Sequence, residues 1–261
     1  MSVRGARWTL RNRLAEHRIY LPIARRKYGD AVLSPDTQLV IDGFTRSGVT
    51  FAVFAFQLAQ RRPVRVAHHL HASSHLIAAA RRGVPALLVI RGPEAAVLSA
   101  MIREPHVTAA AALRAYTRFH QRLWPFRQSL VVGEFDRVTA DFGQVIDDLN
   151  RRYGTTFEAF RHTADNVSCV FRLIEDRSRR PPWRTALGRL ENGRIGLAEY
   201  EGAVAAAGGR ERLSAAVETR IARPSAEREA MKERLRGRVA SESALLAEAR
   251  DAFAALVGST R

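Results

Sequence analysis

The chain has little of what secreted and membrane-spanning proteins need. Its 261 residues include one cysteine, Cys169, so no disulfide can form within the chain. No apolar run reaches about 18 residues, the length that a transmembrane helix needs, so no membrane span is expected. The segment from Met1 to Arg13 carries arginines but lacks the apolar centre of a secretory signal. These absences favour a cytoplasmic protein and leave peripheral contact with a membrane open.

Lysine is scarce as well. The 42 basic residues include only Lys27 and Lys232, and all the others are arginine. With 26 acidic residues the formal net charge is +16. Such a charge attracts any anion, whether a nucleotide, a nucleic acid, an acidic glycan or a membrane surface, so it does not choose among them. Because no helix-turn-helix, zinc-finger or RNP motif is evident, nucleic acid is not the favoured partner.

One loop has the spacing of a phosphate-binding loop but lacks its lysine. Apolar residues 38–42 predict a strand, and Val49–Gln60 predicts a helix. Between them, Gly43–Thr50 follows the pattern G-x-x-x-x-G-K-[ST], except that Val49 replaces the lysine and Arg46 supplies a cation within the loop. A strand, a loop and a helix in this order direct backbone N–H groups at one anion. The sequence therefore predicts a phosphate-bearing ligand other than a simple ATP substrate.

A second strand ends in a residue that a nucleoside triphosphatase would not use. The run Ala86–Ile90 predicts a buried parallel strand, and Arg91 follows it where such an enzyme presents a magnesium-binding aspartate. Pro93 and Glu94 suit the first turn of a helix, which would carry Ser99 in its second turn. Arg91 can approach Ser99 only if the ligand lies beside this helix.

Together these segments resemble the nucleotide motifs of the sulfotransferases that use 3′-phosphoadenosine 5′-phosphosulfate (PAPS). Arg46–Phe51 resembles that family's 5′-phosphosulfate loop, with Val49 in place of threonine and Phe51 in place of tryptophan. Arg91 and Ser99, eight residues apart, are similar to the arginine and serine that bind the 3′-phosphate in the family. The order of these parts along the chain is more specific than any one of them.

Three further segments bear on the same resemblance. His69–His71 resembles the segment that carries the family's catalytic histidine, with His71 in place of proline. Val131–Asp136 resembles the family's Tyr-Glu-Asp strand, so the likeness covers roughly residues 38 to 157. The family's C-terminal Arg-Lys-Gly-x-x-Gly signature is not found. Arg223–Arg228 is a candidate substitute, as basic C-terminal segments are in some bacterial members.

The resemblance implies a P-loop-like three-layer α/β fold with a mainly parallel central sheet, flanking helices and a helical C-terminal extension. It implies PAPS as the sulfuryl donor, adenosine 3′,5′-bisphosphate as the product and no metal. His69 would be the catalytic base that takes a proton from an acceptor hydroxyl or amine, and Arg46 would neutralise charge on the leaving 5′-phosphate. The nucleotide-binding residues implied are Arg46, Ser47, Gly48, Val49, Thr50, Phe51, Arg91 and Ser99.

The histidine-rich segment allows two other interpretations. His71 and His75 have the i, i+4 spacing of zinc ligands, but no carboxylate lies between His68 and His75, so a metal site is not favoured. In the passive interpretation, Val64–His68 is a strand and His75 packs on the helix that follows it. Which neighbouring histidine is the base stays open, although His69 lies just past the strand, where ligands gather in open α/β sheets.

The predicted elements divide the chain into three parts. Residues 1–35 form a basic N-terminal leader with a short helix near Trp8–Arg18, residues 36–160 form the α/β core, and residues 161–261 form a mostly helical cap of the same domain. The basic segment Arg177–Arg184 is interpreted as a surface linker in preference to a lid. The other predicted elements are helices at Ser73–Arg82, Glu94–Arg103, Thr108–Leu123, Asp141–Tyr153, Pro224–Arg238 and Ser241–Val257, and a strand at Ser129–Gly133.

Three functions are therefore weighed. The first is a PAPS-dependent sulfotransferase, the second a P-loop kinase or related phosphotransferase, and the third a non-catalytic anion-binding or nucleic-acid-binding protein. The missing lysine at Val49 and the arginine at position 91 weigh against the kinase. The acceptor, whether a small molecule, a lipid, a peptide or a carbohydrate, and the oligomeric state are not readable from the sequence.

Overall fold

A parallel sheet organises the protein. The computed structural model describes residues 2–179, 181–210 and 225–258. Within these ranges the sheet has four strands in the order β2-β1-β3-β4, and each neighbouring pair is parallel. The strands are β1 (Leu39–Asp42), β2 (Val66–His68), β3 (Ala86–Ile90) and β4 (Val131–Glu134). The α/β class and the parallel central sheet flanked by helices are thus confirmed.

Alternate residues of the strands face two separate hydrophobic cores. Ile41 and Val89 belong to one core, whereas Val40 and Leu88 belong to the other, because successive side chains of a strand point to opposite faces. All four side chains are fully buried. The strands are apolar on both faces, as expected for a sheet that is covered by helices on both sides.

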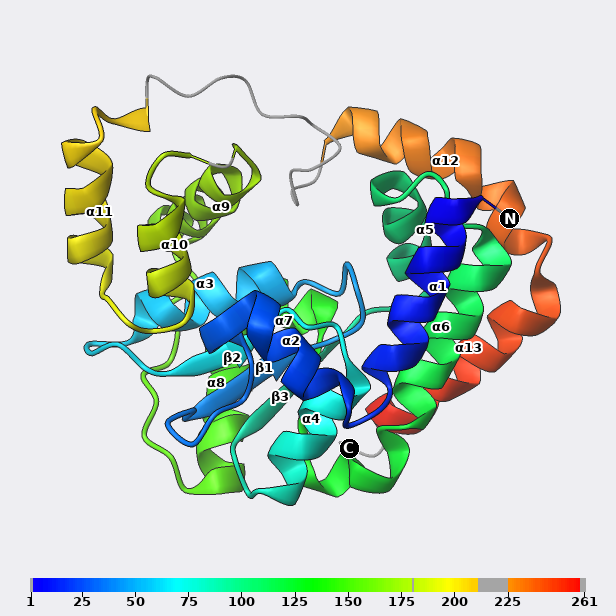
Figure 1. Cartoon of the computed structure of the whole chain (residues 1–261), viewed down its shortest axis with the longest axis horizontal. Helices are drawn as coiled ribbons and strands as arrows, with labels where there is room; N and C mark the ends of the chain where they lie inside the picture. Colours follow the sequence, from blue (N-terminus) through cyan, green and yellow to red (C-terminus); the bar gives the residue numbers. More distant parts are fainter. Residues whose placement is uncertain (1, 180, 211–224, 259–261) are drawn as a thin grey trace.

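Helices cover both faces of this sheet (Figure 1). The core on the Ile41 face also contains residues of α3 (Val49–Ala59), α7 (Phe135–Ala140), α8 (Phe142–Tyr153), α9 (Ala164–Arg179), α10 (Arg184–Glu191) and α11 (Leu197–Ala206). The core on the Val40 face contains residues of α4 (Ser73–Arg81), α5 (Pro93–Arg103), α6 (Ala109–Gln121), α12 (Ala226–Ala240) and α13 (Ser243–Val257). The result is a three-layer arrangement.

The strand order creates a crevice at the carboxyl edge of the sheet. From β1 the chain passes through α3 on one face to β2, and from β2 it passes through α4 on the other face to β3, which lies on the opposite side of β1. The loops that follow β1 and β3 therefore diverge. Ligands of open α/β sheets bind at such a switch point. Arg46 follows β1 and Arg91 follows β3, so both flank this crevice.

Most element boundaries agree with the sequence predictions within two or three residues, and the differences have local causes. The strand predicted at Ser129 begins at Val131, because a 3₁₀ helix, η2 (Trp124–Ser129), occupies the preceding residues. The first helix begins at Val3 instead of near Trp8, because the Ser2 side chain accepts a hydrogen bond from the Gly5 N–H and caps it. Pro224, the predicted start of a terminal helix, lies outside the described residues.

The interpretation of Arg177–Arg184 as a surface linker is wrong at both ends. Arg177 belongs to the last turn of α9, and Trp183 is buried. The Trp183 indole N–H donates to the Tyr200 hydroxyl at 3.1 Å, and Tyr200 in turn donates to the buried Asp176 carboxylate at 2.7 Å. A large aromatic side chain with a satisfied N–H anchors this segment in the core, which the run of arginines and prolines concealed.

The N-terminal residues form two helices on the Val40 side of the sheet. Helix α1 (Val3–Ala15) packs on α6, and α2 (Tyr20–Tyr28), followed by the short 3₁₀ helix η1 (Gly29–Ala31), packs on α4. Figure 1 shows both helices, in dark blue, on the outside of the molecule. Over the described residues, none of the helices has the length and apolar character that crossing a membrane requires.

Candidate functional site

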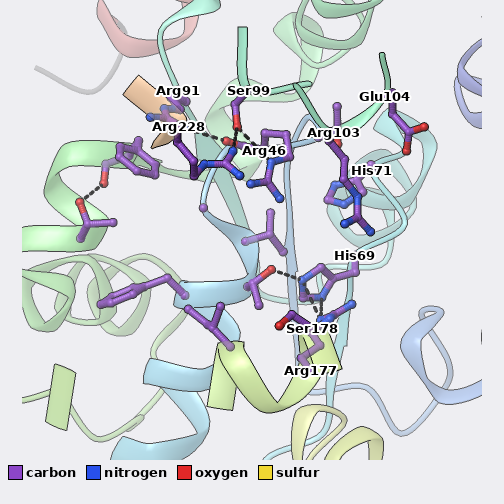
Figure 2. Close-up of a pocket in the computed structure, with 18 of the residues that line it drawn as sticks. Arg46, His69, His71, Arg91, Ser99, Arg103, Glu104, Arg177, Ser178 and Arg228 are labelled. Atoms are coloured by element: carbon purple, nitrogen blue, oxygen red, sulfur yellow. Dashed lines mark hydrogen bonds between the residues drawn. The ribbon is translucent and has the colours of Figure 1, made fainter. Parts of the chain in front are cut away.

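A cavity of about 520 Å³ lies at the carboxyl edge of the sheet. This volume is in the range of sites that bind small molecules and cofactors. Helix α9 lines one side, and α5 and α12 line the other. Figure 2 shows its two ends: Arg46, Arg91, Ser99 and Arg228 gather at one, which we call the arginine end, and His69, Arg177 and Ser178 gather at the other, the histidine end. Arg103 and His71 overlap in this view between the two groups.

The loop after β1 forms the wall between these ends. Gly43 is required there, because a Cβ at this position would lie 2.1 Å from the Val89 carbonyl oxygen. Gly48 has φ 98°, a left-handed conformation that favours glycine, and it precedes the first residue of α3. The amino end of α3 therefore opens into the cavity, where its free N–H groups and dipole favour an anion. The strand, loop and helix predicted around the two glycines are present.

The arginine end is built around one hydroxyl group. Arg46 Nε donates to Ser99 Oγ at 3.1 Å, and a terminal nitrogen of Arg228 donates to the same oxygen at 3.2 Å. Ser99 and Arg228 are buried. Arg91 is tied to the loop, since it donates to the Arg46 carbonyl oxygen at 3.3 Å, and its guanidinium stacks 3.9 Å from the centre of the Phe135 ring. Residues from the loops after β1 and β3 and from α5 and α12 thus converge.

The guanidinium groups at this end crowd one another. Burial lowers the pKa of Arg46 to about 9, and the positive charges of Arg228, Arg103 and Arg91 contribute to the shift. Burial also lowers the pKa of Arg91. Each group remains charged at neutral pH, so the cluster holds positive charges together at a cost in free energy. An anion with two negative charges would relieve that repulsion, because it would accept charge-assisted hydrogen bonds from several arginines at once.

His69 is the centre of the histidine end. Its Nε2 lies 3.0 Å from Thr50 Oγ1 and 3.0 Å from a guanidinium nitrogen of Arg177, and its Nδ1 lies 2.7 Å from His68 Nδ1. Arg177 can only donate, and the shorter of its two contacts is with Nε2, at 3.0 Å against 3.3 Å with Nδ1, so the hydrogen of neutral His69 is assigned to Nδ1, where His68 accepts it. In this tautomer the lone pair of Nε2 accepts a hydrogen bond from Arg177.

The surroundings of His69 keep it uncharged. Burial lowers its pKa well below the ordinary value, and the nearby Arg177 adds to the effect. Burial also lowers the pKa of His68, to about 3. Arg177 forms an ion pair with Glu191, which burial makes easier to protonate by raising its pKa. A neutral imidazole can accept a proton at Nε2 from a bound hydroxyl group once that group displaces Arg177 from the lone pair.

Asp42 fixes the two segments that carry these groups. One of its carboxylate oxygens accepts the backbone N–H of Gly43 at 2.9 Å and that of His71 at 3.0 Å, and the other accepts Nδ1–H of His75 at 2.8 Å. Burial acts to raise the pKa of Asp42, but the interactions with His75, His71 and Gly43 outweigh it, so the pKa is lowered. Asp42 therefore joins the loop after β1 to the segment after β2.

The passive interpretation of His75 agrees with its surroundings. Its ring is fully buried, its Nδ1 donates to Asp42, and its Nε2 accepts the Leu33 backbone N–H at 3.1 Å. Both ring nitrogens are thus engaged within the fold, so the zinc pairing of His71 with His75 has no free ligand atom at His75. Across the described ranges, no group of three histidine, cysteine or acidic side chains is placed to hold a metal ion.

Backbone conformation singles out the same cavity. In the part of the chain that the structure describes, the non-glycine residues with positive φ are Arg46 at 70°, His69 at 58° and His71 at 51°. All three line the cavity. Left-handed conformations cost side-chain-bearing residues free energy and persist where the surrounding structure imposes them, often at functional sites. The left-handed conformation of His71 is held by Asp42, whose carboxylate accepts the His71 backbone N–H.

The structure brings together all but one of the nucleotide-binding residues predicted from the sequence. Arg46, Gly48, Val49, Thr50, Phe51, Arg91 and Ser99 line the cavity, together with His69. Ser47 does not. Its side chain is fully buried, and its backbone N–H donates to the Phe44 carbonyl oxygen at 3.2 Å, so the expected role of that N–H in holding a phosphate has no support.

The sequence prediction missed Arg103 and Arg177 and treated the segment containing Arg228 only as a candidate. Arg103 is the last residue of α5. Basic side chains are favoured at the carboxyl ends of helices, so its sequence position gave no sign of a role in the cavity. Arg177 lay within a run of basic residues interpreted as a linker. In a chain with this many arginines, only the fold shows which of them enter the cavity.

Comparison of the chain with protein-family models, with curated proteins and with solved structures found no match. The functional conclusion therefore rests on the cavity itself.

Proposed function

We propose that the protein is a sulfotransferase with a P-loop-like nucleotide site, which moves a sulfuryl group from PAPS to a hydroxyl or amine of an acceptor. One observation carries the proposal: a single cavity joins a buried arginine cluster around Ser99 to a neutral histidine beside Thr50, with the amino end of α3 between them. A ligand with two separated phosphate groups and a reactive end fits that arrangement.

The chain's own groups suit the nucleotide. The Ser99 hydroxyl with Arg46, Arg91 and Arg228 would bind the 3′-phosphate, and the free N–H groups at the start of α3 with Thr50 would hold the 5′-phosphate. Arg46 lies in the loop between the two positions, so its charge serves both. A kinase carries carboxylates for magnesium at this edge of the sheet. Here Arg91 follows β3, and both carboxylate oxygens of Asp42 are hydrogen-bonded to Gly43, His71 and His75.

When bound, PAPS would supply an activated sulfuryl group on its 5′-phosphate. The acceptor hydroxyl would displace Arg177 from His69 Nε2, which would then accept its proton, because a hydroxyl is a poor nucleophile until that proton leaves. His68 would keep the imidazole in the required tautomer by accepting Nδ1–H. The positive end of α3 and Arg46 would stabilise the negative charge that collects on the leaving phosphate. The role of the protein would thus combine positioning, electrostatic stabilisation and proton transfer to His69.

A calorimetric comparison separates this function from a phosphotransferase. We expect adenosine 3′,5′-bisphosphate to bind in the presence of a chelator and ATP with magnesium to bind much more weakly, because the cavity offers arginines for a second phosphate. Transfer of labelled sulfate from PAPS to a panel of hydroxyl and amine acceptors would then establish catalysis. Tighter binding of magnesium–ATP than of the bisphosphate would contradict the proposal and favour a kinase. Bisphosphate binding without transfer to any acceptor would favour a non-catalytic protein.

A further inference from the structure

Large exposed apolar side chains gather on the two N-terminal helices. Val3, Leu10 and Leu14 of α1 and Ile19 and Ile23 at α2 have exposed fractions of 78%, 59%, 40%, 64% and 56%. Among the described residues the one other large apolar side chain with this exposure is Trp124, at 40%. We call the five side chains the apolar strip. Single exposed apolar residues are common, but a group confined to one surface marks an interaction site.

The strip lies away from the faces by which these helices pack. At 3.6 residues per turn, Val3, Leu10 and Leu14 fall within about 40° of one another around α1. The buried residues of α1, Gly5 and Ala15, lie on its other side, where Ala15 packs with Tyr20 and Ala24 of α2. Ile19 and Ile23 are likewise one turn apart, and the buried residues of α2, Tyr20 and Ala24, lie about 100° from them around the helix. The strip therefore points outward.

Positive charge surrounds the strip. On α1, Arg7 and Arg13 flank it on opposite sides, and on α2, Arg26 and Lys27 flank Ile23. The basic side chains of residues 2–28 are Arg4, Arg7, Arg11, Arg13, Arg18, Arg25, Arg26 and Lys27. Glu16, the acidic side chain in this range, is paired with Arg118 of α6.

A shallow hollow lies beside the strip. Arg4, Arg7, Trp8, Arg11 and His106 line this space of about 320 Å³. Three guanidinium groups next to an indole ring suit a phosphate group attached to a less polar body. The hollow shares Arg11 with the large cavity.

We propose that the outward face of α1 and α2 docks on an anionic lipid bilayer. The apolar strip would enter the region of headgroups and upper acyl chains, the flanking arginines would bind lipid phosphates, and the hollow would hold one headgroup. An apolar strip bordered by basic side chains is the pattern of helices that lie in a membrane interface. Duplex or single-stranded nucleic acid would use the arginines but leave the exposed valine, leucines and isoleucines in contact with water.

Docking in this way does not depend on the proposed function. One consequence does rest on it: because Arg11 lines both the hollow and the large cavity, a docked enzyme would draw its acceptor from the headgroup region. Membrane binding and sulfuryl transfer are measured separately, so failure of one leaves the other standing.

Flotation of the full chain with vesicles tests the docking proposal. We expect binding to vesicles of phosphatidylcholine mixed with phosphatidylglycerol and little binding to phosphatidylcholine alone. The double variant Leu10→Gln/Leu14→Gln should lose about tenfold or more in partitioning, because two leucines no longer enter the apolar layer. Arg4→Gln and Arg7→Gln should each lose about fivefold, the effect of one basic residue near an anionic surface. Trp124→Gln, an exposed apolar residue outside the strip, is the matched control and should bind as the unaltered chain does.

Two further measurements keep the test decisive. Thermal unfolding should be unchanged in the leucine variant, and if it is not, Ile19→Gln/Ile23→Gln replaces that variant with the same expected loss. Duplex DNA added as a competitor should lower vesicle binding of the strip variants and of the unaltered chain by the same factor. Absence of vesicle binding at low salt, or equal binding by strip variants and the unaltered chain, would overturn the proposal.

Discussion

The two ends of the cavity experience the same physical influences and reach opposite results. Burial and positive neighbours lower the pKa of Arg46 at one end and of His69 at the other. Arg46 starts from 12.5 and falls to about 9, so it keeps its charge at neutral pH. The pKa of His69 starts from 6.5 and is lowered well below it, so the ring is neutral at neutral pH. The same influences thus leave a charged arginine at one end and a neutral imidazole at the other.

Removing the base should have the largest effect on this comparison. His69→Ala should lower turnover by roughly 10²- to 10⁴-fold, the usual contribution of general base catalysis, and leave the affinity for adenosine 3′,5′-bisphosphate nearly unchanged. Steady-state sulfate transfer and calorimetry measure the two quantities. His17→Ala, an exposed histidine outside the cavity, is the control. If His69→Ala lost nucleotide affinity as well as turnover, the claim that the histidine end serves catalysis and the arginine end serves binding would be contradicted.

The arginine end should respond in the complementary way. Arg228→Met should weaken binding of adenosine 3′,5′-bisphosphate by about 10- to 100-fold, as expected for losing charge-assisted hydrogen bonds to a phosphate. Without ligand the variant should unfold at the same temperature or higher, because one charge leaves a crowded cluster. Arg234→Met, an exposed arginine on the same helix, is the control. If Arg228→Met bound the nucleotide with unaltered affinity, the proposal that the 3′-phosphate binds at this end would be contradicted.

Arg177 offers a smaller test at the histidine end. Its charge lowers the pKa of His69, so Arg177→Gln should raise that pKa. The base works in its neutral form, and the acid limb of the pH–turnover profile should therefore move to higher pH. Profiles of turnover against pH for the two proteins measure the shift. An acid limb at the same pH in both would show that another group controls the reaction.

A histidine outside the cavity, His120, shows what burial does without charged neighbours, against an opposing hydrogen bond to the Tyr116 carbonyl oxygen. Burial lowers the pKa of His120 to about 4, and no arginine contributes. The unfolded chain binds the proton near 6.5, so His120 stabilises the fold above that pH, and this contribution is lost as pH falls toward 4. In His120→Gln the free energy of unfolding should fall less steeply, by up to about 1.4 kcal/mol per pH unit, between those values. Chemical denaturation across this range measures the slope, and equal slopes would contradict the assignment.

The sequence could predict the parts of the site that local pattern determines. The apolar runs of β1 and β3, Gly43 and Gly48 in the loop, and Arg91 with Ser99 at a strand-to-helix junction all follow from spacing, and the structure brings them to one cavity. Glycine spacing and strand ends are local properties of the chain, so no knowledge of the distant packing was needed.

The missing parts depend on contacts between distant segments. Arg228 reaches Ser99 across 129 positions of the chain, and Arg177 reaches His69 across 108. Among so many arginines, neither has a local feature that separates it from a solvent-exposed side chain. The buried Trp183 was missed for the same reason, because its partner, Tyr200, lies in the next helix but one. Ser47 shows the converse, since its place in the motif did not reveal that it faces the interior.

The central claim is that the arginine end recognises a second phosphate on a nucleotide. Calorimetric titration of the unaltered protein with adenosine 3′,5′-bisphosphate and with adenosine 5′-monophosphate, both in the presence of a chelator, tests it most directly, because the two ligands differ only in the 3′-phosphate. The account predicts that the bisphosphate binds at least about 10- to 100-fold more tightly. Equal affinities for the two ligands would contradict it.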